Sequence, residues 1–127
     1  MKDTSEKNKQ SALDFLKLVI TGHIDKAYEK YVDMKGKHHN AYTLAGFSAL
    51  QKGMKDADIQ FPHKQFSAKH ILGDGDLVAI HSHLLLEVGK TDLVVVHLFR
   101  FKDDKIVEMW DLGQAITPDL LNKDGVF

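Results

Sequence analysis

The spacing of apolar residues changes once along the chain, from a helical repeat to the alternation of strands. In the first half, apolar side chains recur every three or four residues, as in helices that bury one face. After Phe66 they alternate with polar residues or run continuously, as in strands. The helical spacing predicts a first helix that stops at Gly22 and has on its apolar side Ala12, Phe15, Leu16, Val19 and Ile20.

Two further helices are predicted before the change of period. A short second helix, capped by Asp25, has on its apolar side Ala27, Tyr28, Tyr31 and Val32. Residues 35–40, Lys-Gly-Lys-His-His-Asn, break the pattern. A third helix over roughly residues 43–57 ends before Pro62 and has on its apolar side Phe47, Leu50, Met54 and Ala57.

Four strands are predicted in the second half, over residues 66–72, 77–88, 93–101 and 106–114. Short turns at residues 73–76, 89–90 and 103–104 join them, so neighbouring strands should be antiparallel. Helices followed by strands favour an α+β fold with the helices on one face of a curved sheet. A chain of 127 residues, 43% of them hydrophobic, fits a single domain over residues 1–127.

Two polar residues interrupt the apolar final hairpin, His97 on one arm and Asp111 on the other. Polar side chains in such strands need a hydrogen-bond partner or a function. Because side chains alternate between the faces of a sheet, the turn decides whether the two meet. A three-residue loop at residues 102–104 would pair Phe101 with Lys105 and put His97 and Asp111 on one face, whereas a two-residue turn would separate them.

The three-residue loop is compatible with the sequence, since Asp tolerates the left-handed backbone that it needs, although Gly would suit it better. One face of the hairpin would then carry Val95, His97, Phe99, Val107, Met109 and Asp111. The other would carry Val96, Leu98, Arg100, Glu108 and Trp110, with Arg100 and Glu108 able to pair. Because this second face is so apolar, we expect it to be shielded from water, either by a second copy of the chain or by the chain's own tail.

Composition argues against several kinds of site. The 17 basic and 18 acidic residues are scattered, so no basic stripe is available for nucleic acid. The chain has no cysteine, which fits a reducing compartment, and no Gly-rich turn for a nucleotide cofactor. Neither a signal peptide nor a membrane span of roughly 18 apolar residues is evident, so we expect a cytoplasmic protein. Eight histidines favour acid/base or metal chemistry.

Three segments together resemble the SnoaL-like polyketide cyclases. They are the pair His39-Asn40, residues 75–83 (Gly-Asp-Leu-Val-Ala-Ile-His-Ser-His) and residues 99–111 (Phe-Arg-Phe-Lys-Asp-Asp-Lys-Ile-Val-Glu-Met-Trp-Asp). The similarity continues into the tail, residues 117–127. This family shares the cone-shaped fold of nuclear transport factor 2, which ketosteroid isomerase and scytalone dehydratase also use. The resemblance implies about three helices on a curved, mainly antiparallel sheet, a deep apolar pocket, cofactor-free acid/base chemistry, and commonly a homodimer through the outer sheet face, here including Trp110.

The resemblance also implies roles for the hairpin residues. In the cyclases an aspartate late in the last strand acts as acid/base, with a histidine on the preceding strand; these correspond to Asp111 and His97. This mapping favours the three-residue loop. Asp111 would take a proton from carbon beside a carbonyl, and His97 would donate a hydrogen bond to the enolate that forms. Val95 departs from the cyclase pattern, which has a glutamine at that position.

Five further residues are candidates for substrate binding. The loop between helices would bring Asn40 and His39 to the pocket mouth, where Asn40 offers a donor and an acceptor, while His38 should face solvent. On the strands, the remaining candidates are His81, Phe99 and Met109. The sequence leaves open which face of the sheet His81 and His83 occupy.

The leading interpretation is a cofactor-independent enzyme that performs aldol-type cyclisation, isomerisation or dehydration on a small apolar carbonyl compound. One alternative is a binding module that holds an apolar ligand without chemistry, which Val95 favours. Another is a metal site formed by His81, His83, His97 and Asp111, although the leading interpretation needs no metal. An interaction protein that uses the outer sheet face is a fourth possibility.

Overall fold

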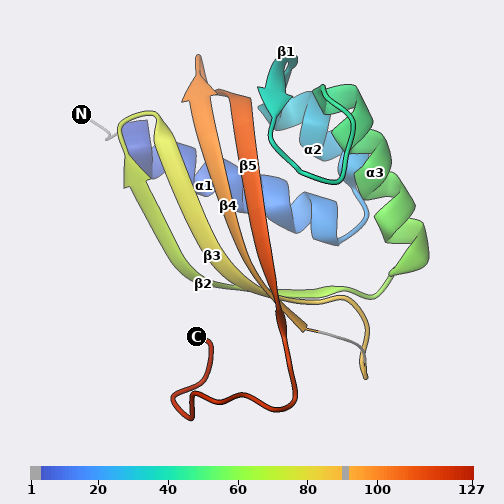
Figure 1. Ribbon diagram of the computed structural model, residues 1–127. Helices are drawn as coiled ribbons and strands as arrows, with labels where there is room; N and C mark the ends of the chain where they lie inside the picture. The colour runs from blue at the N-terminus through green and yellow to red at the C-terminus, as the bar shows by residue number, and fades with distance from the viewer. Residues whose placement is uncertain (1–3, 90–91) are drawn as a thin grey trace.

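The computed structural model describes residues 4–89 and 92–127. In this part of the chain, helices pack on one face of a curved sheet (Figure 1). The elements are α1 (Thr4–Ile20), α2 (Ile24–Tyr31), β1 (Val32–His38), α3 (Phe47–Gln60), β2 (Gln65–Asp74), β3 (Leu77–Leu85), β4 (Asp92–Lys102) and β5 (Lys105–Ile116). The strand order is β1-β5-β4-β3-β2, and only the β1–β5 pair is parallel. The predicted α+β fold is confirmed.

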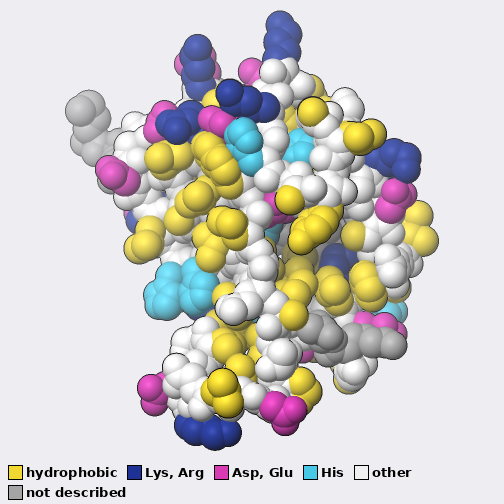
Figure 2. All heavy atoms as spheres, in the orientation of Figure 1, with side chains coloured by type: hydrophobic (Ala, Val, Ile, Leu, Met, Phe, Trp, Pro, Cys, Tyr) yellow, Lys and Arg dark blue, Asp and Glu magenta, His cyan; other side chains and the backbone are white. Residues whose placement is uncertain are grey.

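The outer face of the sheet, which is turned toward the viewer in Figure 1, is apolar over several strands. Hydrophobic side chains gather there in Figure 2. Pairing between strands forms two rows across it, Leu72-Ala79-Leu98-Trp110 and His70-His81-Val96-Leu112. The tail covers part of this face, because the Phe127 ring lies 4.9 Å from that of His83. Leu112, however, is 61% exposed.

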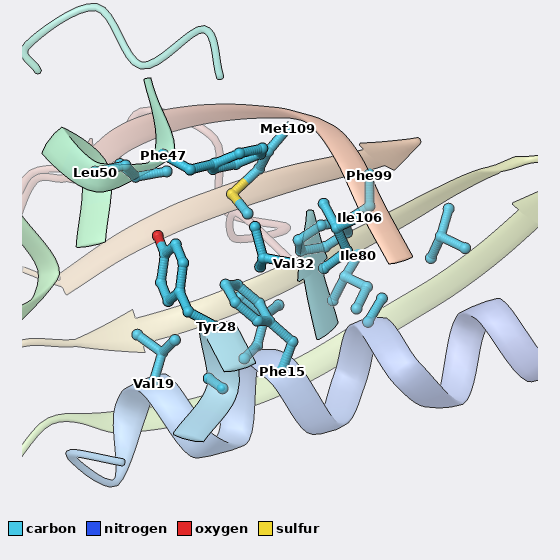
Figure 3. Close-up of a cluster of buried hydrophobic side chains, with 14 of the residues drawn as sticks. Phe15, Val19, Tyr28, Val32, Phe47, Leu50, Ile80, Phe99, Ile106 and Met109 are labelled. Atoms are coloured by element: carbon cyan, nitrogen blue, oxygen red, sulfur yellow. The ribbon is translucent and has the colours of Figure 1, made fainter. Parts of the chain in front are cut away.

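The core lies between the helices and the inner face of the sheet (Figure 3). Phe15 of α1 contacts Tyr28 of α2 and Phe99 of β4 edge to face, with ring centroids 5.5 and 5.9 Å apart. Such edge contacts suit the aromatic quadrupole and help to fix how the helices sit on the sheet. The predicted apolar faces are confirmed for the buried side chains Ala12, Phe15, Leu16, Val19, Ala27, Tyr28, Phe47 and Leu50.

Two predicted helix starts are wrong. Asp25 does not cap α2, because His23 occupies the cap position and no side chain caps the helix. The Asp25 carboxylate instead accepts hydrogen bonds from Gln51 and Lys55 of α3. The third helix begins at Phe47 rather than near residue 43, since the preceding residues form a loop folded around Asn40.

The first strand was not predicted. Val32 is the C-cap of α2 and the first residue of β1, and the segment that was read as a break continues this strand. Gly36 explains the polar, loop-like sequence, because a Cβ there would lie 2.2 Å from the carbonyl oxygen of Val107. Glycine thus allows β1 to approach β5 closely, at an irregularity in the register of the two strands.

The turn between β4 and β5 differs from the predicted three-residue loop. Lys102 pairs with Lys105 across a two-residue turn. Both turn residues are left-handed, with φ of 51° at Asp103 and 66° at Asp104. A type I′ turn requires this conformation at both positions, and its twist matches that of the strands. The predicted turn at residues 89–90 cannot be compared, because Lys90 lies outside the described residues.

A bulge next to this turn restores the predicted meeting of the two polar residues. The register shifts so that Arg100 lies opposite Glu108 and Val107 is the extra residue. His97 is then directly opposite Asp111. The shared face of His97 and Asp111 is confirmed, but half-buried Val107 does not belong to the core cluster. The predicted pairing of Arg100 with Glu108 is also confirmed, with Nε and Oε1 3.4 Å apart.

Candidate functional site

His97 and Asp111 face each other on the inner side of the sheet, in a cross-strand row that begins with Ile71 and fully buried Ile80. Directly opposed residues in an antiparallel pair have side chains within contact distance. An imidazole and a carboxylate are therefore neighbours on a surface that is otherwise apolar.

Asn40 holds the Asp111 carboxylate. Its Nδ2 donates to both carboxylate oxygens, at 3.0 and 2.9 Å. Its Oδ1 accepts from the backbone N–H of Tyr42 and from the Thr43 hydroxyl, both at 2.9 Å. These two donors fix the orientation of the amide, because the reverse orientation would set its oxygen against the carboxylate. Asn40 is thus a rigid partner of Asp111.

His38, expected to face solvent, is buried and helps to hold this loop. Its Nδ1 accepts the backbone N–H of Asn40 at 3.1 Å, and its Nε2 lies 2.8 Å from the carbonyl oxygen of Leu44. Nε2 as the donor and Nδ1 as the acceptor satisfy both contacts. The prediction failed because His38 ends β1, the strand that the sequence pattern did not reveal.

The His97 ring stacks on Phe99, with centroids 5.9 Å apart and planes 11° apart. The residue is half-buried, but its Nδ1 is shielded from solvent and has no hydrogen-bond partner among the described residues. Burial lowers the pKa of His97 to about 4, while the charge of Asp111 opposes this shift. His97 is consequently neutral near pH 7 and carries one N–H donor and one acceptor.

A cavity of about 220 Å³ lies between α1, α3 and the sheet, with His97 and Asp111 in its wall. Its other lining residues are Leu16, Val19, Ile20, Met54, Ala57, Lys64, Phe66, Ser82, Leu84, Leu86 and Val95. The Ser82 hydroxyl donates to the Val95 carbonyl at 3.2 Å, so it is satisfied within the protein. Apolar walls with a few polar groups are typical of small-molecule sites.

Tyr28 lies close to the pair from the helical side. Its hydroxyl donates to the Met54 sulfur at 3.2 Å. Burial raises the pKa of Tyr28, and the charge of Asp111 raises it further. The sequence identified Tyr28 only as an apolar helix residue, and it is not among the residues that line the cavity.

The structure separates the other predicted binding residues from the cavity. His39 lies on the outer side, where Nε2 is 2.6 Å from Glu108 Oε2 and the ring stacks on Trp110 at 5.1 Å. Phe99 and Met109 are buried in the core and are not among the lining residues. The Phe99 ring stacks on that of His97 and so supports it from the core.

His81 and His83 also point to the outer face. His81 stacks on His70, with the two Nδ1 atoms 2.9 Å apart, and His83 bonds Asp92 at 2.9 Å. The alternative metal site is wrong, because the sheet separates these two histidines from His97 and Asp111. Across residues 4–89 and 92–127, no group of three or more potential metal-binding side chains is found. No helix in these ranges is long and apolar enough to span a membrane.

Lys64 is a charged cavity residue that the sequence did not indicate. Its side chain is only 6% exposed. Lysine just before a strand usually lies in solvent, and no spacing pattern marks one that turns inward. Pro62, two residues earlier, indicates a loop but does not predict where the Lys64 side chain points.

Comparison with solved structures finds proteins of the same fold. AclR from Streptomyces galilaeus, a proposed hydroxylase, is 19% identical over 87% of this chain and 91% of its own, with a TM-score of 0.75. A SnoaL-like polyketide cyclase from Agrobacterium tumefaciens is 14% identical over 84% of this chain and 91% of its own (TM-score 0.69). An NTF2-like protein of unknown function from Cytophaga hutchinsonii is 11% identical over 84% of this chain and 89% of its own (TM-score 0.68).

These structural likenesses show the fold, and the expected nuclear transport factor 2-like architecture is confirmed. No match was found among curated proteins. The family model described as the SnoaL-like domain matches residues 13–109, which span most of the chain and contain His97. The chain belongs to the SnoaL-like domain family.

Proposed function

We propose that this protein is a cofactor-independent acid/base catalyst that acts on a small apolar carbonyl compound. The observation that supports this best is the pairing of Asp111 with a neutral imidazole, His97, in the wall of an apolar cavity. The buried Nδ1 of His97 has no hydrogen-bond partner among the described residues, and an unsatisfied buried polar atom calls for an explanation beyond packing. The SnoaL-like domain match over residues 13–109 supports this class of reaction.

The proposed first step moves one proton. Asp111 takes it from the carbon next to the carbonyl, and the electrons of the broken C–H bond pass to the carbonyl oxygen as an enolate. A neutral N–H of His97 donates a hydrogen bond to that oxygen and stabilises the negative charge where it develops. Aldol-type cyclisation, isomerisation and dehydration can all begin with this step. Protonated Asp111 then returns the proton.

Asn40 positions the base in this scheme. Each carboxylate oxygen has more than one lone pair, so Asp111 can accept from Nδ2 of Asn40 and still approach a substrate proton. The fixed amide restricts rotation of the carboxylate, which helps because proton transfer depends on orientation.

The test is exchange of the protons next to the carbonyl of 2-heptanone and related apolar ketones, followed by NMR in heavy water. We expect Asp111→Asn to slow enzyme-dependent exchange by about 100-fold or more, the range for loss of a general base. The matched control is Asp92→Asn, which alters another His–Asp pair, on the outer face with His83. Equal exchange in wild type and Asp111→Asn would contradict the proposal.

A binding module remains a second candidate. Val95 supports it, because this apolar side chain lines the cavity at the position where the cyclase pattern has a glutamine. In this case an apolar ketone would bind without being chemically altered, and wild type and Asp111→Asn would bind it with the same affinity. Binding without exchange therefore distinguishes it from the enzyme.

The outer sheet face supports a homodimer as part of the proposal. Val96, Leu98 and Trp110 lie in its rows, and Leu112 beside them is 61% exposed. A second copy would remove this apolar surface from water. The tail shields the histidine side of the face and leaves the Trp110 side for the partner.

A further inference from the structure

Lys64 is unusual because a lysine side chain only 6% exposed lines an apolar cavity. Lysine is rarely buried unless its charge is paired. Here the ammonium lies 3.3 Å from Asp58 Oδ1 and donates to the Phe61 carbonyl at 2.9 Å. The second contact ties Lys64 to the end of α3, where carbonyl oxygens lack helical partners.

These contacts do not use all the hydrogen-bond donors of the ammonium group. It has three N–H donors, and the two acceptors found among the described residues engage two of them. Asp58 is 31% exposed, so solvent weakens its hold on the lysine charge. The third N–H, and the part of the positive charge that Asp58 does not neutralise, are therefore available to a ligand oxygen.

The cation and the acid/base pair belong to different ends of the cavity. Lys64 directly precedes Gln65, which pairs with Leu85, whereas His97 pairs with Ile80. Five residues along β3 correspond to about 17 Å, which the flexible lysine stem shortens. The cavity wall between the two levels is apolar and includes Phe66, Leu84 and Val95.

We propose that Lys64 binds a carboxylate, so that the substrate is a small keto acid: a carboxylate at Lys64, an apolar middle, and a carbonyl group at His97 and Asp111. This inference rests on the proposed function. A carboxylate suits the site better than a phosphate, since one partly neutralised lysine offers less than the charge of a phosphate dianion. The volume of about 220 Å³ also requires a small ligand.

The test compares 7-oxooctanoate with its neutral amide, 7-oxooctanamide, by calorimetry. We expect wild type to bind the acid about tenfold or more tightly than the amide, the range for one charge-assisted hydrogen bond. Lys64→Met should lose this preference. Lys55→Met is the matched control, because it removes another Asp-paired lysine, exposed on α3, and should keep the preference. A preference that survives Lys64→Met overturns the inference.

A purely structural Lys64 would behave differently in a second variant. Asp58→Asn removes the competing carboxylate but keeps the lysine, so the preference for the acid should increase. An unchanged preference in Asp58→Asn counts against carboxylate binding, and this comparison still decides if Lys64→Met does not fold.

The two proposals can fail separately. If wild type binds acid and amide equally but exchanges the protons of both through Asp111, the lysine inference is wrong and the catalytic proposal stands. If it prefers the acid through Lys64 but shows no Asp111-dependent exchange, carboxylate binding stands and catalysis does not.

Discussion

The pairing of His97 with Asp111 was predictable because polar residues in apolar strands are conspicuous and alternation limits where they point. The sequence could not show how they meet. A shorter turn than expected and a bulge at Val107 each shift the register, and together they bring the two residues directly opposite each other. Both depend on backbone conformation rather than on apolar spacing.

Residues outside a periodic pattern were harder to place. Asn40 was expected at the pocket, and it donates a hydrogen bond to Asp111 in the cavity wall. Its neighbours point away from the cavity: His38 contacts the Leu44 carbonyl, and His39 contacts Glu108. The direction of each side chain here follows from hydrogen bonds within a loop. Lys64 carried no signal at all, since its burial depends on Asp58 and on the end of α3.

The shifted pKa of His97 predicts a pH-dependent stability. With a folded pKa of about 4 against an ordinary 6.5, the unfolded chain binds more protons between these values. Stability should therefore fall as the pH drops through this window, by about 2 kcal/mol between pH 7 and pH 5. Urea unfolding at both pH values checks this in wild type and His97→Gln.

The glutamine variant isolates the histidine. It should lose less stability than wild type between the two pH values, because the remaining titratable groups are common to both proteins. An identical loss in both would mean that His97 is protonated as readily in the folded as in the unfolded chain.

At the scale of elements, helices and long strands were predictable and β1 was not. Helices with a strongly apolar face leave a clear period, and the strands from β2 to β5 contain long apolar runs. Strand β1 is short, mostly polar and parallel to a distant partner, so its pairing depends on the close approach at Gly36. A glycine between two lysines is also typical of a loop, so the sequence does not reveal that β1 approaches β5 here.

Gly36 supplies a prediction for this element. Gly36→Ala should lower the free energy of unfolding by about 2 kcal/mol, because the added Cβ would meet the Val107 carbonyl and force β1 away from β5. Gly113→Ala is the control, since a Cβ in that strand has ordinary contact at 3.9 Å and should change stability by less than about 0.5 kcal/mol. Chemical denaturation of both variants tests the difference, and equal stability would rule out the close approach.

For the whole molecule, the fold class followed from helices preceding strands and from the family resemblance. The cavity did not follow, because its volume depends on how α1 and α3 lean on the sheet. Aromatic contacts among Phe15, Tyr28 and Phe99 help to set that arrangement, and they involve three elements distant in sequence. The spacing of apolar residues predicts that such residues are buried, but it does not predict the volume left between them.

The proposed homodimer gives a prediction at this scale. Leu112→Glu places a charge on an exposed apolar position of the outer face and should convert a dimer to a monomer in sedimentation velocity. Ile59→Glu, which changes an 80% exposed apolar residue on α3, should leave the dimer intact. A wild type that sediments as a monomer would contradict the proposed interface.

The most direct test of the central claim is an NMR titration of the histidine side chains in wild type and in Asp111→Asn. We expect His97 to stay neutral until the pH approaches about 4, and to titrate at still lower pH in the variant, because the Asp111 charge favours the imidazolium. A His97 that titrates near its ordinary pKa of 6.5 and ignores the substitution would contradict a coupled pair in the cavity.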